Sequence, residues 1–201
     1  MRTRIIALTI TLAFIILACG CCSTSSSTQS TPAPANTVST PAPAKTVSTP
    51  AQTLKQDSAS VGERNAAAKA KSYLSYSAFS RDGLIKQLEY EKFSHQEAVY
   101  GVDQSGADWN EQAAKKAKSY LDYSSFSRDG LIKQLEYEGF THQEAVYGVD
   151  QSGANWNEQA ALKAESYLKY SSFSRSGLID QLEYEGFTPQ QAEYGVRAVG
   201  Y

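Results

Sequence analysis

The sequence predicts an all-α protein with three tandem helix-turn-helix repeats, preceded by an export signal and a disordered stalk. The motif K-S-Y-L or E-S-Y-L places serine at residues 72, 119 and 166, a constant step of 47 residues. Residues 63–109 and 110–156 are identical at 38 of 47 positions, which indicates a recent duplication. Self-similarity at a fixed period of this size is typical of an array of supersecondary units. The third copy occupies residues 157–201.

The first 18 residues have the pattern of a lipoprotein signal peptide. Residues 1–4 are basic, and residues 5–17 form an apolar run of 13 residues. A helix of that length covers only about 20 Å, which is short of a hydrocarbon core of roughly 30 Å. Ile16-Leu17-Ala18-Cys19 resembles a bacterial lipobox, so we expect lipid on Cys19, with Cys21 as the alternative. An ordinary signal peptide that happens to end in cysteines is the competing interpretation.

Residues 19–62 are predicted to be a disordered stalk. They are rich in Ser, Thr, Pro and Ala, and T-P-A-P-A recurs at residues 31–35 and 40–44. Such a segment has too little apolar surface to offset the loss of chain entropy, and its prolines favour polyproline II. It would serve as a spacer that lifts the repeats off the membrane, or simply as a tolerated linker.

Each repeat is predicted to contain about three short helices, here described for the middle copy. Ala113–Tyr123 has apolar residues at helical spacing. Ser127 is placed to cap a second helix that ends at Gly139, a residue suited to a left-handed turn. Thr141 and Glu144 form a capping box for the third helix. In the last copy, Pro189 takes the first position of that helix, where its missing N–H costs nothing.

Repeat one departs from this pattern at the turn between its second and third helices. Lys92 stands where the other copies have Gly139 and Gly186. A left-handed residue other than glycine costs roughly 1 kcal/mol, so we expect this turn to be the weakest of the three. The alternative is that the turn in repeat one closes differently.

The remaining aromatic and titratable residues are interpreted as structural. We expect most tyrosines to be in the core or half-buried, and Trp109 and Trp156, just before the next repeat, to be buried at the junctions or, less simply, to bind a partner. His95 and His142 are predicted to be exposed. The three cysteines all precede the repeats, which excludes a disulfide or zinc site there. No catalytic constellation is recognisable, so we expect neither an enzyme nor a cofactor or metal.

The charge of the repeats argues against nucleic acid as a partner. Residues 63–201 carry 15 basic and 20 acidic side chains, and the third helix of repeat two has no Arg or Lys. A DNA-reading helix-turn-helix needs basic residues for the phosphates. The acidic residues are either a partner surface or an ordinary solvated face. The predicted partner-binding set is Glu89, Glu91, Glu97, Glu136, Glu138, Glu144, Asp150, Glu183, Glu185 and Glu193. We expect reversal of Glu136, Glu138 and Glu144 to leave the fold intact, because they lie outside the apolar stripe.

The run S-R-D-G-L-I-K-Q-L-E-Y-E-G-F-T-H-Q-E-A-V-Y-G-V-D, followed by W-N-E-Q-A-A and K-A-K-S-Y-L, resembles the repeat of the Ltp family of host cell surface-exposed lipoproteins. The resemblance covers residues 63–201. It implies superinfection exclusion, in which an acidic helix-turn-helix surface binds a basic segment of the phage tape measure protein and blocks DNA injection.

The resemblance further implies a monomer on the outer face of the cytoplasmic membrane, exposed to the cell wall of a Gram-positive host. Only its lipid anchor would contact the membrane. Many family members are chromosomal, and the alternative function is therefore a host surface module that contacts cell wall or another surface protein. Genes of a prophage beside this one would favour the first.

Overall fold

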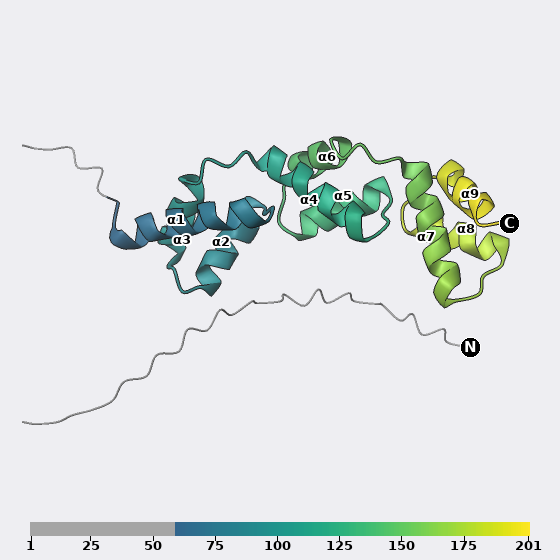
Figure 1. Ribbon diagram of the computed structural model, residues 1–201, viewed down its shortest axis with the longest axis horizontal. Coiled ribbons are helices and arrows are strands. Elements are labelled where there is room, and N and C mark those ends of the chain that lie inside the picture. Colours follow the sequence, from purple (N-terminus) through teal and green to yellow (C-terminus); the bar gives the residue numbers. More distant parts are fainter. Residues whose placement is uncertain (1–58) are drawn as a thin grey trace, which may run out of the picture. The chain divides into compact units, whose positions relative to one another are not determined.

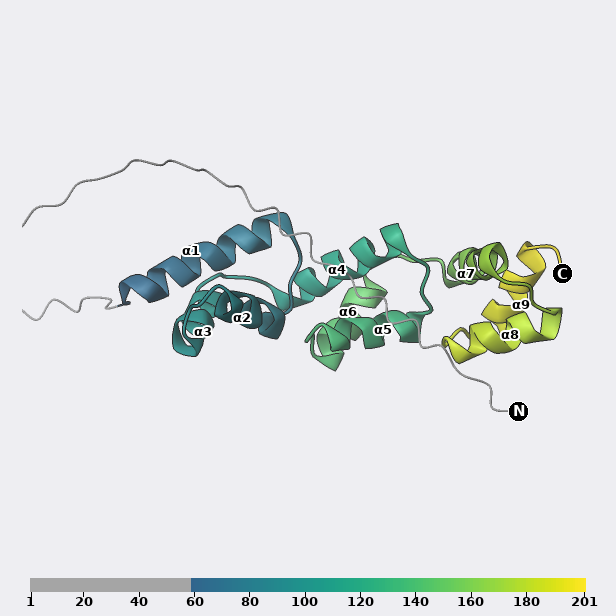
Figure 2. The same cartoon turned by 90° about the horizontal axis from the view of Figure 1, so that it is seen from below.

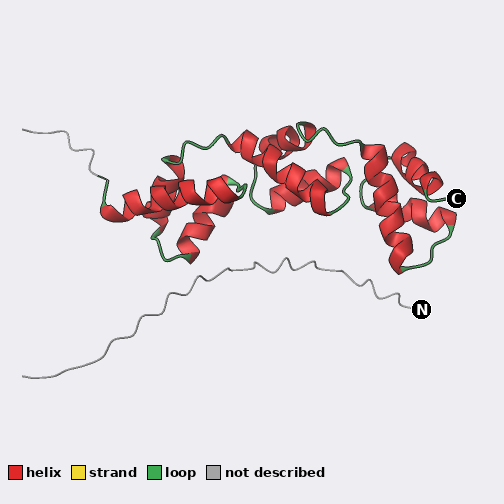
Figure 3. Ribbon diagram, viewed as in Figure 1, coloured by secondary structure: helices red, strands yellow, loops and turns green. Residues whose placement is uncertain are grey.

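The structure, a computed structural model, describes residues 59–201, and this part of the chain is entirely helical outside its loops (Figure 1, Figure 3). The all-α prediction with three repeats of three helices is therefore confirmed. Its helices are α1 (Val61–Tyr76), α2 (Arg81–Tyr90), α3 (His95–Asp103), α4 (Trp109–Tyr123), α5 (Arg128–Tyr137), α6 (His142–Asp150), α7 (Trp156–Tyr170), α8 (Arg175–Tyr184) and α9 (Pro189–Ala198). None of these helices is long and apolar enough to cross a membrane. The predicted signal peptide, Cys19, Cys21 and nearly all of the predicted stalk lie outside the described residues.

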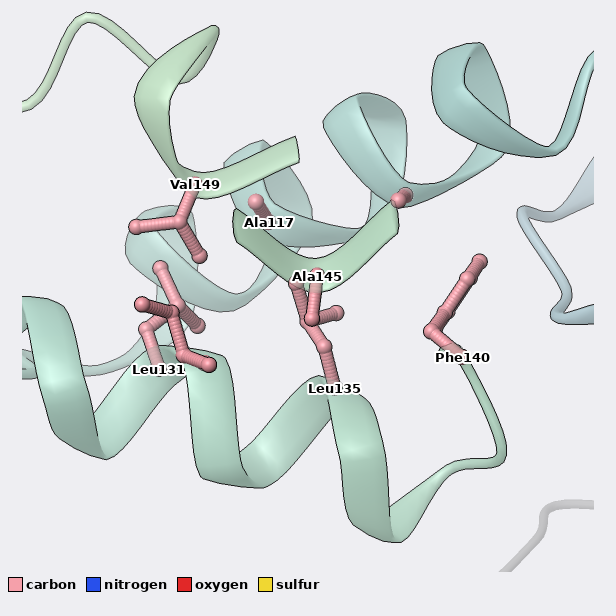
Figure 4. Close-up of a cluster of buried hydrophobic side chains, with 8 residues drawn as sticks. Ala117, Leu131, Leu135, Phe140, Ala145 and Val149 are labelled. Carbon is pink, nitrogen blue, oxygen red and sulfur yellow. The ribbon is translucent and has the colours of Figure 1, made fainter. Parts of the chain in front are cut away.

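Each repeat closes its own hydrophobic core. The long first helix packs chiefly against the third, and the second helix packs across them (Figure 2). In repeat two, Leu131 and Leu135 are fully buried against alanines of α4 and against Val149 of α6 (Figure 4). Equivalent clusters fill repeats one and three. Every cluster is assembled mainly from its own repeat, so each repeat has a hydrophobic core of its own.

The predicted helix caps of repeat two are confirmed. Ser127 Oγ accepts a hydrogen bond from Gly130 N at 2.9 Å, and the Thr141–Glu144 capping box is complete. Pro189 occupies the first position of α9 as expected. These bonds satisfy backbone N–H groups that have no partner within the first turn.

The predicted start of the first helix was wrong. Helix α4 begins at Trp109, not at Ala113, because Asp108 caps it by accepting hydrogen bonds from Asn110 N and Glu111 N at 2.9 and 3.2 Å. Trp109 is thus the first residue of a helix of repeat two, one residue before the predicted repeat boundary. Repeat one likewise begins early, at Val61.

Glycine in each third helix permits close contact with the first helix. A Cβ atom built on Gly148 would lie 2.5 Å from the carbonyl carbon of Ala113, far inside van der Waals contact. Gly101 and Gly195 approach Ala66 and Ala160 in the same way. The backbones of the two helices therefore pack directly on each other at this crossing.

The turn after the second helix has the geometry that the sequence predicts. Lys92 has φ 74°, and Gly139 and Gly186 have φ 90° and 89°. Lys92 is the one non-glycine residue with positive φ within residues 59–201. Repeat one therefore carries a strained backbone position that the other two repeats avoid.

We expect Lys92→Gly to stabilise repeat one by up to about 1 kcal/mol, because glycine adopts positive φ without strain. Thermal unfolding of residues 59–201, followed through Trp109 fluorescence, measures the change. Lys92→Ala serves as the control, since it removes the charge but keeps the Cβ atom. Equal midpoints for the glycine and alanine variants would show that backbone strain does not limit the stability of this turn.

Candidate functional site

Most of the acidic residues predicted to bind a partner fall into three structural settings, and the other two form ion pairs with arginines. The first contains Glu91, Glu138 and Glu185, the residues that end the second helices. In repeat two, Glu138 accepts a hydrogen bond from Tyr120 and pairs with Lys116, whose Nζ lies 2.7 Å from Glu138 Oε2. Gln134 Nε2 donates to Tyr120 Oη at 3.1 Å. Because its side chain is only 25% exposed and fully engaged, Glu138 holds α5 against α4.

The same network recurs in repeats one and three, and it raises the pKa of its tyrosine in all three repeats. Burial, together with the hydrogen bond to Glu138, raises the pKa of Tyr120. Burial alone would raise the pKa of Glu91, but the hydrogen bonds from Tyr73 and Lys69 outweigh it and lower that pKa. The proton therefore stays on the phenol and the charge on the carboxylate.

The second setting is the capping box at the start of the third helix. Thr141 N donates to Glu144 Oε2 at 2.8 Å, and Ser94 N donates to Glu97 Oε2 at the same distance. The hydrogen bonds from Ser94 lower the pKa of Glu97. Both carboxylates thus already accept a hydrogen bond from the backbone at the start of their own helix, which leaves them only partly available to a partner. Reversal of Glu138 and Glu144 to lysine would remove these contacts, so we now expect it to weaken the fold.

Glu193 was wrongly grouped with Glu97 and Glu144. It aligns with Val146 of repeat two, and the capping box of repeat three is made by Gln191. Glu193 instead pairs with Arg175 across to α8. Asp150 is engaged in a comparable way, with Arg128 Nη2 at 2.7 Å from its Oδ1. Counting charges along the chain did not show that these two exposed carboxylates pair with arginines of another helix.

The third setting leaves glutamates on the outside of the second helix. We call Glu89, Glu136 and Glu183 the outer glutamates. His142 Nδ1 lies 2.6 Å from Glu136 Oε1, and His95 and Glu89 form the same contact in repeat one. The histidine side chains are 73% and 76% exposed, which confirms their predicted exposure. In repeat three Pro189 replaces the histidine, and Glu183 has no ion-pair partner within the described repeats.

The prediction that most tyrosines are buried or half-buried was wrong for six of them. They are the last residues of the first and second helices, with 69–89% exposure. They are Tyr76, Tyr90, Tyr123, Tyr137, Tyr170 and Tyr184. Their spacing contained the signal, because Tyr123 and Tyr137 do not continue the stripes formed by Ala113, Ala117 and Tyr120 and by Leu131 and Leu135.

Each second helix consequently ends in an exposed tyrosine that follows a glutamate, which is itself exposed in repeats two and three and half-buried in repeat one. Tyr137 directly follows Glu136, and the same dipeptide occurs at residues 89–90 and 183–184. A carboxylate binds Arg or Lys by a charge-assisted hydrogen bond, and an exposed aromatic ring attracts a cation over its face. These three Glu–Tyr pairs are the candidate site. Within residues 59–201, no group of three or more His, Cys, Asp or Glu side chains is arranged to hold a metal ion.

Comparison with known proteins places the repeats in a family. The family model described as host cell surface-exposed lipoprotein matches residues 63–104, 108–151 and 155–199, about two thirds of the chain. The chain belongs to this Ltp family. Its three matches coincide with the three helical repeats, and the family description is that of a surface-exposed lipoprotein.

A solved structure also matches. It is described as Ltp, a superinfection exclusion protein from the Streptococcus thermophilus temperate phage TP-J34. It is 39% identical over 46% of this chain and 97% of that chain, with a TM-score of 0.44. A search of curated proteins found no match.

Proposed function

We propose that this protein is a superinfection exclusion lipoprotein. A lipid on Cys19 anchors it to the outer face of the cytoplasmic membrane, and the repeats extend into the wall. There they capture a basic segment of an incoming phage, such as part of its tape measure protein, and so prevent injection of the phage DNA. The observation that carries the proposal is the Glu–Tyr pair, with its exposed tyrosine, in every repeat of an Ltp-family lipoprotein.

The chemistry of these pairs favours a basic protein segment as the partner. Helices α3 and α6, which follow the pairs in repeats one and two, contain no Lys or Arg. A partner rich in Lys or Arg therefore meets carboxylates and aromatic rings without cationic neighbours from those helices. Since the carboxylates are exposed, binding is expected to weaken as salt rises, with screening beyond roughly 8–10 Å.

The test compares two triple charge reversals in the full-length, anchored protein. The first changes the outer glutamates (Glu89→Lys, Glu136→Lys, Glu183→Lys). The control makes the same change in charge at exposed sites inside helices (Asp122→Lys, Glu165→Lys, Asp180→Lys). Plaque formation and phage adsorption are measured on cells that express each variant.

Wild type and control are expected to reduce plaque formation without reducing adsorption. The outer variant is expected to lose exclusion by about tenfold or more, because three exposed charge contacts of roughly 0.5 kcal/mol each correspond to that factor. Circular dichroism checks the fold, and mass spectrometry of the mature N-terminus checks for lipid on Cys19.

A folded, anchored outer variant that still excludes phage would refute the electrostatic mechanism. If the wild type excludes none of the phages that infect its host, the alternative function applies. The protein would then be a host surface module that contacts cell wall or another surface protein. The six exposed tyrosines favour that alternative, since aromatic rings also suit flat, weakly polar ligands.

A further inference from the structure

The second helix of each repeat is linked to the second helix of the next repeat by a shared serine. Ser80 Oγ accepts a hydrogen bond from Gly83 N at 2.9 Å and donates one to the carbonyl oxygen of Glu138 at 2.5 Å. Ser127 repeats this arrangement with the carbonyl of Glu185, also at 2.5 Å. The two serines are 2% and 1% exposed. The start of one helix thus caps the end of another, and we call this contact the joint.

Side chains from the first helix of the following repeat complete the joint. Trp109 of α4 packs against the core of repeat one, and Trp156 of α7 packs against the core of repeat two. Gln112 is buried, and its counterpart Gln159 accepts a hydrogen bond from Phe126 N at 3.3 Å. The same residue types therefore recur at both joints.

Glycine after the second helix is favoured by close contacts at the joint as well as by its backbone angle. A Cβ atom on Gly139 would lie 3.0 Å from Ser80 Oγ and 3.3 Å from Asp82 Cβ. On Gly186 it would lie 3.0 Å from Ser127 Oγ. A longer side chain at either position would have to pass between the two repeats.

Repeat one lacks the corresponding features on the face that would receive a preceding repeat. Gly62 stands in place of the tryptophan, Asn65 in place of the glutamine and Lys92 in place of the glycine. At the other end of the described repeats, Ser174 caps α8 as its counterparts do but is exposed. Repeats one and three of the described residues therefore present two different halves of the same joint.

We infer that repeat one is a dedicated end unit, in which Lys92 prevents the repeat-three end of a second copy of this chain from docking through the joint. The joint is a head-to-tail contact, and such contacts generate open filaments when both ends remain competent. Repeat arrays are protected from this by terminal units with altered outer faces. The protein retains the strained conformation of Lys92 because lysine at this position prevents a second copy from docking on repeat one. This inference is independent of the proposed function.

The first experiment places a lysine in the joint between repeats one and two, at the position equivalent to Lys92. Residues 59–201 contain no cysteine, so spin labels at Ser75→Cys and Asp122→Cys, two equivalent exposed positions, report the distance between repeats one and two. Gly139→Lys is compared with Gly106→Lys, which imposes lysine at φ 74° but has no atom within 4 Å of its Cβ position. Electron–electron resonance gives the distance distribution of each.

We expect a narrow distribution for the parent and for Gly106→Lys, and a broad one for Gly139→Lys. An unchanged narrow distribution in Gly139→Lys would overturn the inference, because lysine would then be compatible with the joint. A broad distribution in the parent would also overturn it, since the joint would not hold the repeats together.

The second experiment restores the joint residues on the face of repeat one that would receive a preceding repeat. Residues 59–201 with Gly62→Trp, Asn65→Gln and Lys92→Gly are compared with the parent by sedimentation velocity over a range of concentrations. The parent is expected to stay monomeric, and the variant to associate with rising concentration. Adding Ser174→Ala should reverse this association, because it removes the donor at the opposite end. A variant that remains monomeric throughout would refute the role assigned to Lys92.

Discussion

Gly148→Ala is expected to destabilise repeat two by about 2–4 kcal/mol, although alanine is intrinsically about 1 kcal/mol better than glycine inside a helix. The added Cβ would lie 2.5 Å from the carbonyl carbon of Ala113. That contact is with backbone, so no side-chain rotation relieves it, and α4 and α6 must move apart. Their separation would open the core around Val149, which is 1% exposed in the native repeat.

The tryptophans allow this change to be measured in one repeat at a time. Trp156 packs against the core of repeat two, and Trp109 packs against that of repeat one. In a Trp109→Phe background, urea unfolding followed by fluorescence reports the packing of Trp156 of α7 on the core of repeat two. The control is Gly153→Ala, at φ 73° in open space, which should cost only about 1 kcal/mol of backbone strain. A Gly148→Ala variant no less stable than this control would contradict the close helix crossing.

Glu138→Lys is expected to destabilise repeat two by about 2–4 kcal/mol, and Glu136→Lys by less than about 0.5 kcal/mol. The first change removes the acceptor of the Tyr120 hydroxyl and places a second cation beside Lys116. The second removes only an exposed contact with His142. Because the two residues lie two positions apart and carry the same charge, the pair isolates the effect of structural setting.

The same fluorescence assay with Trp156 measures both variants. Equal stabilities would show that the Tyr120–Glu138–Lys116 network contributes nothing to the fold, and Glu138 would return to the set of candidate partner contacts. The distinction matters for any study of phage binding, since a loss of exclusion in Glu138→Lys would arise from the fold. Glu136→Lys leaves the fold in place, so its effect reports on the surface.

Local features of the fold could be predicted from the sequence because they depend on neighbouring residues. The caps at Ser127 and Thr141, the position of Pro189 and the left-handed turn at Lys92 each follow from bonds or angles within a few residues. The start of α4 was placed too late because the aspartate cap at Asp108 lies within the linker between two repeats. The apolar stripes were visible at helical spacing, and the six exposed tyrosines could have been recognised by their absence from these stripes.

The candidate site could be predicted only in part. Family resemblance, net acidity and the positions of the glutamates were all present in the sequence. The sequence did not show which of the acidic residues are available to a partner. The structure does, because Glu138, Glu193 and Asp150 pair with cations on other helices. The outer glutamates are distinguished only once the helices are packed.

By itself, the sequence determined the period of 47 residues, the helical units, their caps and the turn at Lys92, because each is a matter of local spacing and backbone preference. Only the tertiary structure decided that Ser80 caps the helix end of the next repeat and that Gly139 must lack a side chain there. It also explains why lysine is tolerated at residue 92, because within the described residues no preceding repeat packs against that face of repeat one. The physical reason is that hydrogen bonds and steric contacts between residues 58 positions apart depend on how the helices pack. The backbone preferences of neighbouring residues carry no information about such a contact.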